Sequence, residues 1–260
     1  MEHLLTLLVF SLFHINGHFC MEIFGGNEAA PHSRPYMAFL PGKFACGGAL
    51  IKPNWILTAA HCPVDNSSYA ILGAHRLQDA NEQQKLRVKR GITFPCWDRE
   101  LKTNDIQLLQ LEKPAKLNKF VAVLPLPKSE EKIAIKKMCS VAGWGATKAR
   151  GNTPSDVLRE ANLIISDQVA CKELYCKKYK QVITKSMICA GPPKKRKDDT
   201  CAGDSGGPLI CDNKYAGVVS FGPIQCGDGK TPGVYTRLTD KYLKWIRDTI
   251  GGDSYEEYAV

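Results

Sequence analysis

Short apolar and β-prone runs recur along the chain between turn-forming residues. These runs cover residues 35–40, 46–51, 55–59, 70–72, 106–111, 140–143, 208–211 and 216–221. Many short strands separated by loops are typical of an all-β barrel or sandwich, and we predict that fold class.

Residues 112–137 differ from this pattern. They contain Pro114, Pro125 and Pro127, followed by a charged run over residues 128–132. Prolines and clustered charges are typical of a connection between elements. We predict that this segment joins two halves of the protein, with the boundary near residue 127.

The end of the chain has a different periodicity. Tyr242, Leu243, Ile246 and Ile250 recur at helical spacing, with Lys and Arg between them. This pattern predicts one amphipathic C-terminal helix. Residues 251–260 are predicted to form a loose acidic tail.

The beginning of the chain indicates export. Residues 4–13 form an apolar run that is too short for the roughly 20 residues that span a bilayer, but typical of a secretory signal. Glu2 and His3 stand where basic residues usually precede such a run. The 11 cysteines also favour an oxidising compartment. We expect residues 1–20 to be a signal peptide, and no later segment is long and apolar enough to anchor the chain in a membrane.

The protein is strongly basic. Its formal net charge is +9, and removal of residues 1–22 deletes two glutamates and no Lys or Arg, which gives +11. The basic residues gather at 85–90, 136–137, 177–180 and 194–197. Each cluster alone is predicted to be a solvated loop, because no nucleic-acid-binding motif accompanies it. Together they favour binding to a polyanion such as a sulfated proteoglycan.

Residues 203–208, with the sequence Gly-Asp-Ser-Gly-Gly-Pro, place Ser205 in a tight glycine-rich turn. In such a turn, backbone amides can converge on an oxyanion and a substrate can approach closely. A serine hydroxyl is a weak nucleophile near neutral pH, so it needs an adjacent base, which in turn needs a buried carboxylate. A glycine-rich turn without catalysis is the alternative interpretation.

His61 and Asp105 are the candidates for that base and that carboxylate. His61 lies in an apolar segment that contains a cysteine, whereas His32 and His75 sit among polar turn residues and are expected at the surface. Asp105 directly precedes a predicted strand, so we expect it at the start of a half-buried element. An aspartate that merely caps a strand is the alternative.

These segments, in the order His, Asp, Ser, resemble the chymotrypsin family of serine proteases. Matching motifs stand at residues 23–26, 46–48, 58–62, 104–106, 143–145, 204–208 and 232–235. The resemblance covers residues 23–250 and implies two antiparallel six-stranded β-barrels with a C-terminal α-helix. It places His61, Asp105 and Ser205 in the cleft between the barrels, as a catalytic triad. It also implies an oxyanion hole formed by the backbone amides of Gly203 and Ser205.

The resemblance assigns specificity to Asp199, six residues before Ser205, at the base of the primary pocket. A carboxylate there binds a cationic side chain, which implies cleavage of proteins after exposed Lys or Arg. The other substrate-binding residues that it implies are Thr200, Ser220, Gly222 and Gly233. The two glycines leave room for a long side chain. The alternative is that Asp199 belongs to a charged surface loop.

Spacing alone does not determine how the cysteines pair. The resemblance implies the disulfides Cys46–Cys62, Cys139–Cys211, Cys171–Cys189 and Cys201–Cys226. Cys20 leaves with the signal or lies in a short pro-segment. Cys96 has no assigned partner, and Cys176 is either free or competes with Cys189 for Cys171.

The resemblance also implies a zymogen. Removal of residues 21–22 would free the Ile23 amino group to form a buried ion pair with Asp204. Glu22 excludes a trypsin-like activator, which needs a basic residue before the cut, and favours a dipeptidyl peptidase. We therefore expect residues 21–22 to be the activation dipeptide and residues 23–250 to be the protease domain.

Within the family, residues 94–98 with the extra Cys96 resemble granzyme A of cytotoxic lymphocytes, and residues 30–38 fit both granzyme A and its relative granzyme K. The granzyme A resemblance implies storage in secretory granules and a disulfide-linked homodimer through Cys96, whereas the granzyme K resemblance implies a monomer. Phe24, in place of an aliphatic residue, and the basic residues 194–197 depart from the pattern.

Two other functions stay open at this point. A digestive trypsin-like protease would share the triad and the pocket, but its zymogen would carry an acidic run ending in Lys. A catalytically silent, polyanion-binding relative would have lost His or Ser, and this chain retains His61 and Ser205. Asn66 begins a possible glycosylation acceptor, a short pattern that often occurs by chance. The sequence contains no metal cluster or phosphate-binding loop, and we expect no cofactor.

Overall fold

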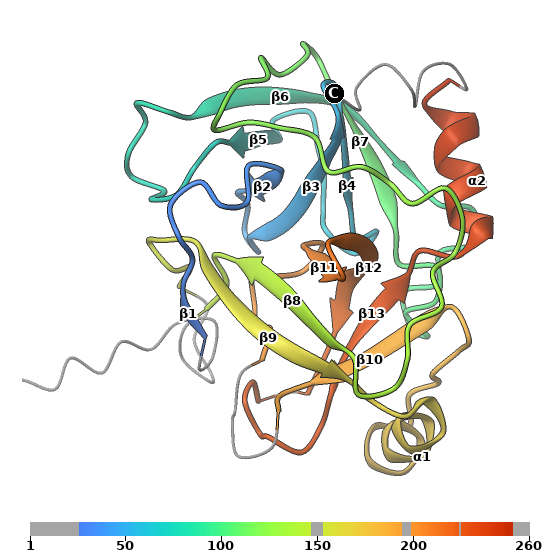
Figure 1. Cartoon of the computed structure of the whole chain (residues 1–260). Coiled ribbons are helices and arrows are strands. Elements are labelled where there is room, and N and C mark those ends of the chain that lie inside the picture. Colours follow the sequence, from blue (N-terminus) through green and yellow to red (C-terminus); the bar gives the residue numbers. More distant parts are fainter. Residues whose placement is uncertain (1–25, 147–152, 194–198, 224, 252–260) are drawn as a thin grey trace, which may run out of the picture.

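The structure, a computed structural model, describes residues 26–146, 153–193, 199–223 and 225–251. These residues form two β-barrels and two helices (Figure 1). The predicted signal peptide (1–20), the activation dipeptide (21–22), the basic cluster at 194–197 and residues 252–260 of the acidic tail lie outside the described residues.

The first barrel has six strands: β2 (Met37–Leu40), β3 (Cys46–Lys52), β4 (Trp55–Thr58), β5 (Tyr69–Leu72), β6 (Gln84–Thr93) and β7 (Gln107–Leu111). They close in the order β2-β3-β4-β7-β6-β5, and all neighbours are antiparallel. In β5, Ala70 and Leu72 are buried while Tyr69 and Ile71 are partly exposed. Alternate side chains of a strand therefore fill the barrel interior.

The second barrel contains β8 (Met138–Gly143), β9 (Arg159–Ile165), β10 (Met187–Gly191), β11 (Pro208–Cys211), β12 (Lys214–Phe221) and β13 (Gly233–Arg237). It closes through the β8–β9 pairing, and the short β1 (Asn27–Glu28) adds to β9. The predicted fold class of two antiparallel six-stranded barrels is confirmed.

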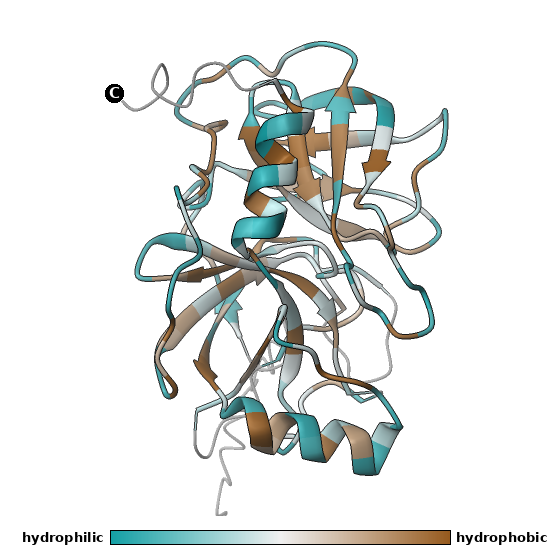
Figure 2. Cartoon of the chain, turned by 90° about the vertical axis from the view of Figure 1, so that its right-hand side faces the viewer, coloured by the Kyte–Doolittle hydropathy of each residue, from teal (hydrophilic) through white to brown (hydrophobic). Residues whose placement is uncertain are grey.

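Helix α2 (Asp240–Thr249) packs on the first barrel, although it follows the second in sequence. Tyr242, Leu243 and Ile246 are buried in the same core as the first-barrel strands. Figure 2 shows hydrophobic and hydrophilic residues alternating along this helix. The predicted C-terminal helix is confirmed.

Helix α1 (Gln168–Tyr179) is absent from the sequence prediction. Its apolar residues do not form a continuous stripe, and only Cys171 and Tyr175 are buried. The helix begins where the Asp167 side chain accepts a hydrogen bond from the Ala170 amide at 2.8 Å. A capping side chain of this kind satisfies one of the free amides of the first turn.

Two of the basic clusters predicted as loops lie in regular structure, so that prediction is wrong for them. Residues 85–90 belong to β6, where Leu86 and Val88 pack towards the core and the charged residues between them face solvent. Residues 177–180 end helix α1. The charges are solvated in both places, because a strand or helix can expose one side while it buries the other.

Residues 112–137, the predicted connection, contain no helix or strand and link β7 to β8. Backbone hydrogen bonds hold this segment against the first barrel: the Ala122 amide donates to Pro35 O at 3.1 Å, and the Leu124 amide donates to Leu50 O at 2.7 Å. In the part of the chain that the structure describes, no helix is both long and apolar enough to cross a membrane.

Candidate active site

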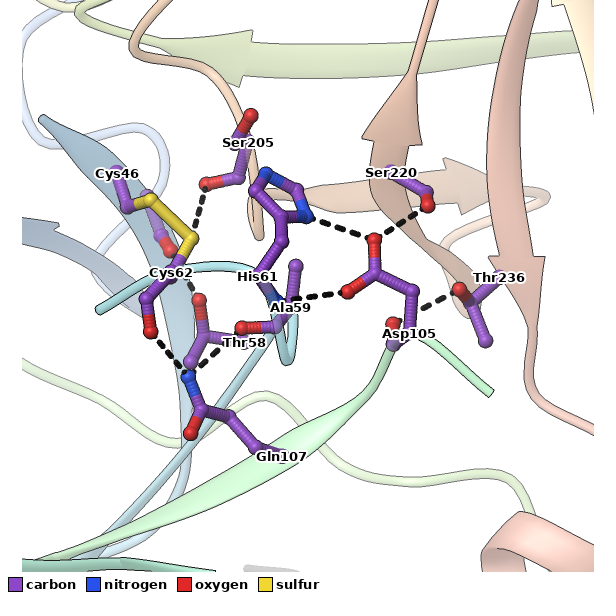
Figure 3. Close-up of polar contacts among 11 residues, drawn as sticks. Cys46, Thr58, Ala59, His61, Cys62, Asp105, Gln107, Ser205, Ser220 and Thr236 are labelled. Atoms are coloured by element: carbon purple, nitrogen blue, oxygen red, sulfur yellow. Dashed lines mark hydrogen bonds and ion pairs between the residues drawn. A yellow bond between two sulfur atoms is a disulfide. The ribbon is translucent and has the colours of Figure 1, made fainter. Parts of the chain in front are cut away.

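His61 and Asp105 lie together where the two barrels face each other (Figure 3). His61 Nδ1 is 2.7 Å from Asp105 Oδ2, and the His61 backbone amide donates to Oδ1 at 2.9 Å. Strands β4 and β7 pair through Thr58 and Gln107, which brings the two residues together across the sequence. A carboxylate at Nδ1 favours the tautomer that carries its proton there, which leaves Nε2 as a proton acceptor.

The second barrel supports the buried Asp105. Ser220, on β12, donates a hydrogen bond to Asp105 Oδ2, and Thr236, on β13, donates to the Asp105 carbonyl at 2.9 Å. Hydrogen bonds to an ionised carboxylate stabilise its charge. The side chain of Ser220, a residue predicted to bind substrate, thus also holds Asp105. The role of Thr236 was not predicted.

Gln107 is a second residue that the sequence analysis missed. It is buried, and its side-chain amide donates to the carbonyls of Ala59 at 2.8 Å and Cys62 at 2.7 Å. These bonds fix both sides of the turn that presents His61. A glutamine at the start of a strand whose other buried residues are leucines is the signal that could have revealed it.

Ser205 reaches the site from the second barrel. The turn that carries it requires left-handed backbone at Gly203 (φ 102°) and Gly206 (φ 84°), where glycine is favoured. The Gly47 amide donates to Ser205 O at 2.7 Å, which joins the turn to β3. Figure 3 shows the His61 ring between Asp105 and Ser205, with no hydrogen bond drawn from the serine hydroxyl to the ring. Contacts of this kind often tighten only when substrate binds.

Two backbone amides beside Ser205 are available to a ligand. The amides of Gly203 and Ser205 donate to no other described residue, whereas the Asp204 amide between them donates to Cys201 O at 3.0 Å. Unused amides next to a candidate nucleophile are the donors that an oxyanion needs.

Asp204 is buried in a cradle made by backbone. Its two carboxylate oxygens accept hydrogen bonds from the amides of Gly145 at 2.8 Å and Cys201 at 2.9 Å. A Cβ at Gly143 or Gly145 would collide with this carboxylate, so both positions require glycine. Burial raises the pKa of Asp204 to about 6. The partner predicted for it, Ile23, lies outside the described residues.

Asp199 is 2% exposed, and only one of its two carboxylate oxygens has a hydrogen-bond partner in the described chain. Its Oδ2 accepts a hydrogen bond from the Gly227 amide at 3.0 Å, but Oδ1 has no partner among the residues that the structure describes. Burial raises the pKa of Asp199 to about 7, against the lowering effect of the nearby backbone amides of Gly227 and Thr200. The site is therefore a buried acid with one free acceptor.

Gly222 and Gly233 face each other close to Thr200, the neighbour of Asp199. A Cβ built on Gly222 would lie 3.9 Å from Gly233 Cα, and one built on Gly233 would lie 3.5 Å from Thr200 Oγ1. Larger residues would therefore narrow the space beside Asp199. Tyr175 of α1 is anchored nearby, because its hydroxyl donates to the carbonyl of Pro232, next to Gly233, at 2.6 Å.

The structure contains the four disulfides that the resemblance implied: Cys46–Cys62, Cys139–Cys211, Cys171–Cys189 and Cys201–Cys226. Cys96 and Cys176 are free and exposed. His61 lies close to the sulfurs of Cys46 and Cys62, but these are bonded to each other. They are therefore not the thiolates that a metal ion would require.

Comparison with known proteins shows which family has this arrangement. The family model described as Trypsin matches residues 23–246. The chain belongs to the trypsin family. It is accordingly a serine protease with the chymotrypsin-like fold.

The relatives of this trypsin-family protein include granzymes. Granzyme A of Bos taurus is 47% identical over 234 residues, which cover 90% of each chain. Mast cell protease 3 of Ovis aries is 44% identical over 236 residues, covering 88% of this chain and 89% of the relative. The solved structure of mouse neuropsin, titled a serine protease expressed in the limbic system of the brain, is 35% identical with a TM-score of 0.77, covering 87% of this chain and 99% of that one.

The raised pKa of Asp199 predicts how this trypsin-family pocket responds to pH. We expect benzamidine, a small cation, to inhibit more weakly as pH falls through about 7, because the neutral acid no longer attracts a cation. Its inhibition constant should be level above about pH 8 and rise by up to tenfold per unit below about pH 6. Neutral benzamide is the control ligand. An inhibition constant for benzamidine that stays level between about pH 5 and 9 would contradict the raised pKa of Asp199.

Proposed function

We propose that the protein is a secreted, granule-type serine endopeptidase, similar to granzyme A, that cleaves peptide bonds after Lys or Arg. The observation that carries this proposal is the buried Oδ1 of Asp199, which no described residue satisfies. An unsatisfied buried acceptor costs free energy, and an ammonium or guanidinium group that enters the pocket would remove that cost. Gly222 and Gly233 leave the space that such a side chain needs.

The geometry supports an acyl-enzyme mechanism. Ser205 Oγ attacks the carbonyl carbon of the substrate while His61 Nε2 accepts the hydroxyl proton, and Asp105 stabilises the resulting imidazolium. The amides of Gly203 and Ser205 hold the oxyanion of the tetrahedral intermediate. His61 then protonates the departing amine, which leaves the acyl group on Ser205. A water molecule then attacks the acyl carbonyl while His61 accepts its proton, and His61 returns this proton to Ser205 Oγ as the acid product leaves.

Replacement of Asp199 tests the specificity. For Asp199→Ser, we expect kcat/KM on Arg and Lys substrates to fall by about a hundredfold or more, because the cation loses its buried partner. Labelling of Ser205 by a fluorophosphonate should persist, since this probe does not need the pocket charge. A retained preference for basic residues would contradict the assignment.

The same labelling separates the alternatives. No label on the correctly processed wild-type chain would favour the catalytically silent, polyanion-binding relative. Cleavage profiling on a protein digest addresses the other alternative, since a digestive trypsin-like protease would cut at most Lys and Arg sites, whereas a granule-type enzyme would select among them.

Activation by loss of residues 21–22 is part of the proposal. Asp204 has only backbone donors among the described residues, so an amino group would supply its missing charge. A chain that begins at Met21 should be nearly inactive, and a chain that begins at Ile23 should be active, when both are assayed on the same Arg substrate. Equal activity of the two chains would refute this step.

Cys96 supports a disulfide-linked homodimer. Its thiol is free and exposed, and its carbonyl accepts a hydrogen bond from Asn104 Nδ2 at 2.8 Å, which fixes the loop that carries it. An exposed free thiol in a secreted protein favours a bond to a second chain. A twofold axis through such a bond would make the contact self-complementary.

Electrophoresis without reductant should therefore show about twice the monomer mass for the wild type. Cys96→Ser should run as a monomer, while Cys176→Ser, which removes the other exposed thiol, should remain a dimer. A monomeric wild type would favour a granzyme K-like protein. A dimer abolished only by Cys176→Ser would contradict the role of Cys96 and remove the main support for the granzyme A assignment.

The exposed side of β6 supports polyanion binding. Lys85, Arg87 and Lys89 alternate along this strand and face solvent. We expect the double variant K85Q/K89Q to elute from heparin at lower salt than the wild type, because fewer cations contact the polyanion. Arg87 is left in place because it pairs with Glu112 at 3.4 Å. The variant K137Q/K244Q removes the same charge from lysines that already pair with carboxylates, and should elute close to the wild type. Equal shifts for both variants would indicate a response to net charge alone.

A further inference from the structure

His75 joins the amino-terminal strand to the body of the protein. Its Nε2 lies 2.8 Å from Glu28 Oε1, and Glu28 belongs to β1, five residues after Ile23. The ring is largely buried, with 11% of the side chain exposed, so the expectation that His75 lies at the surface is wrong. Its Nδ1 has no partner among the described residues, so the contact with Glu28 is its one side-chain hydrogen bond in this part of the chain.

The backbone carbonyl of His75 makes a separate set of contacts. It accepts hydrogen bonds from Trp144 Nε1 at 3.1 Å and from the Leu158 amide at 2.8 Å. The Leu158 carbonyl in turn accepts from the Ala29 amide at 2.9 Å, next to Glu28. Trp144 and Leu158 are both buried in one cluster with Ala29.

Trp144 is adjacent in sequence to the residues that surround the Asp204 carboxylate. It stands between Gly143 and Gly145, the two glycines that the Asp204 carboxylate requires, and the Gly145 amide donates to Asp204 Oδ1. His75 therefore contacts β1 through its ring and the Asp204 cradle through its carbonyl. It belongs neither to the catalytic residues nor to the Asp199 pocket.

We propose that His75 is a positioning residue that couples the seating of β1 to the Asp204 cradle, and so favours the conformation in which the mature amino terminus reaches Asp204. This inference rests on the proposed activation. Release of β1 would leave the buried ring without its hydrogen bond and would break the backbone hydrogen bond between Ala29 and Leu158. Both hydrogen bonds therefore oppose release.

The test measures how well the amino terminus is protected. In a chain that begins at Ile23, a seated amino group is shielded from cyanate, whereas an unseated one is carbamylated. The rate of carbamylation, followed by mass spectrometry of the amino-terminal peptide together with loss of activity, therefore reports the unseated fraction. The variants are Glu28→Gln, His75→Ala and His75→Gln.

Glu82→Gln is the matched control. Glu82 forms the corresponding pair with His32, at 2.7 Å, and the centroid of the His32 ring lies 6.3 Å from that of His75. The same isosteric change therefore removes a carboxylate from a neighbouring histidine and leaves the contacts of His75 with Glu28 and Trp144 in place. A partly exposed ion pair has a modest effect. We therefore expect Glu28→Gln and His75→Ala to be carbamylated about threefold to tenfold faster than the wild type, and Glu82→Gln at the wild-type rate. His75→Gln, which keeps a donor, should restore part of the protection.

Wild-type rates for both Glu28→Gln and His75→Ala, or equal acceleration by Glu82→Gln, would overturn the proposal. If His75→Ala fails to fold, Glu28→Gln decides, because Glu28 is half exposed and its replacement leaves the ring in place. The proposed activation fails separately: in that case wild-type activity survives complete carbamylation of the amino terminus. Loss of wild-type activity with no acceleration in Glu28→Gln rejects the role of His75 alone.

Discussion

The burial of Asp204 constrains the rest of the site. A carboxylate removed from water must be compensated, and in the described residues the compensation comes from two backbone amides, those of Gly145 and Cys201. Amides can approach that closely only where side chains are missing, which explains the glycines at 143 and 145. Because Asp204 precedes Ser205, whatever holds this carboxylate also holds the turn that presents the proposed nucleophile.

Three aspartates of the site are almost equally buried, with exposures of 1% for Asp105, 2% for Asp199 and 1% for Asp204. Their partners differ. Asp105 accepts from His61 and Ser220, so it orients a ring; Asp204 accepts from two amides, so it fixes a turn. One carboxylate oxygen of Asp199 has no partner in the described chain, so it is available to accept a hydrogen bond from a ligand. The number of hydrogen bonds, rather than the depth of burial, separates the three proposed roles.

Much of this fold could be predicted because its motifs are local. The turn around Ser205, the segment around His61 and the C-terminal helix each show a pattern within a few residues. The errors have physical causes. Strand β6 was hidden because charged residues alternate with Leu86 and Val88, and helix α1 buries too few apolar residues to show a helical period. The contact of Ser220 with Asp105 joins residues 115 positions apart, and no local pattern encodes it.

Helix α2 has a consequence for how the protein folds. The ring of Phe94, at the end of the first barrel, packs edge-on against Tyr242 at 4.9 Å and Trp245 at 5.2 Å, and Ile246 shares the core of that barrel. Asn104, just before Asp105, also accepts a hydrogen bond from the Tyr242 hydroxyl at 3.0 Å. The core of the first barrel is therefore incomplete until the last turns of the chain have left the ribosome. Contacts of such long range slow folding and leave apolar surface exposed in the meantime. The two barrels are thus separate in architecture, but the first barrel, although synthesised first, cannot complete its core before helix α2 has been made.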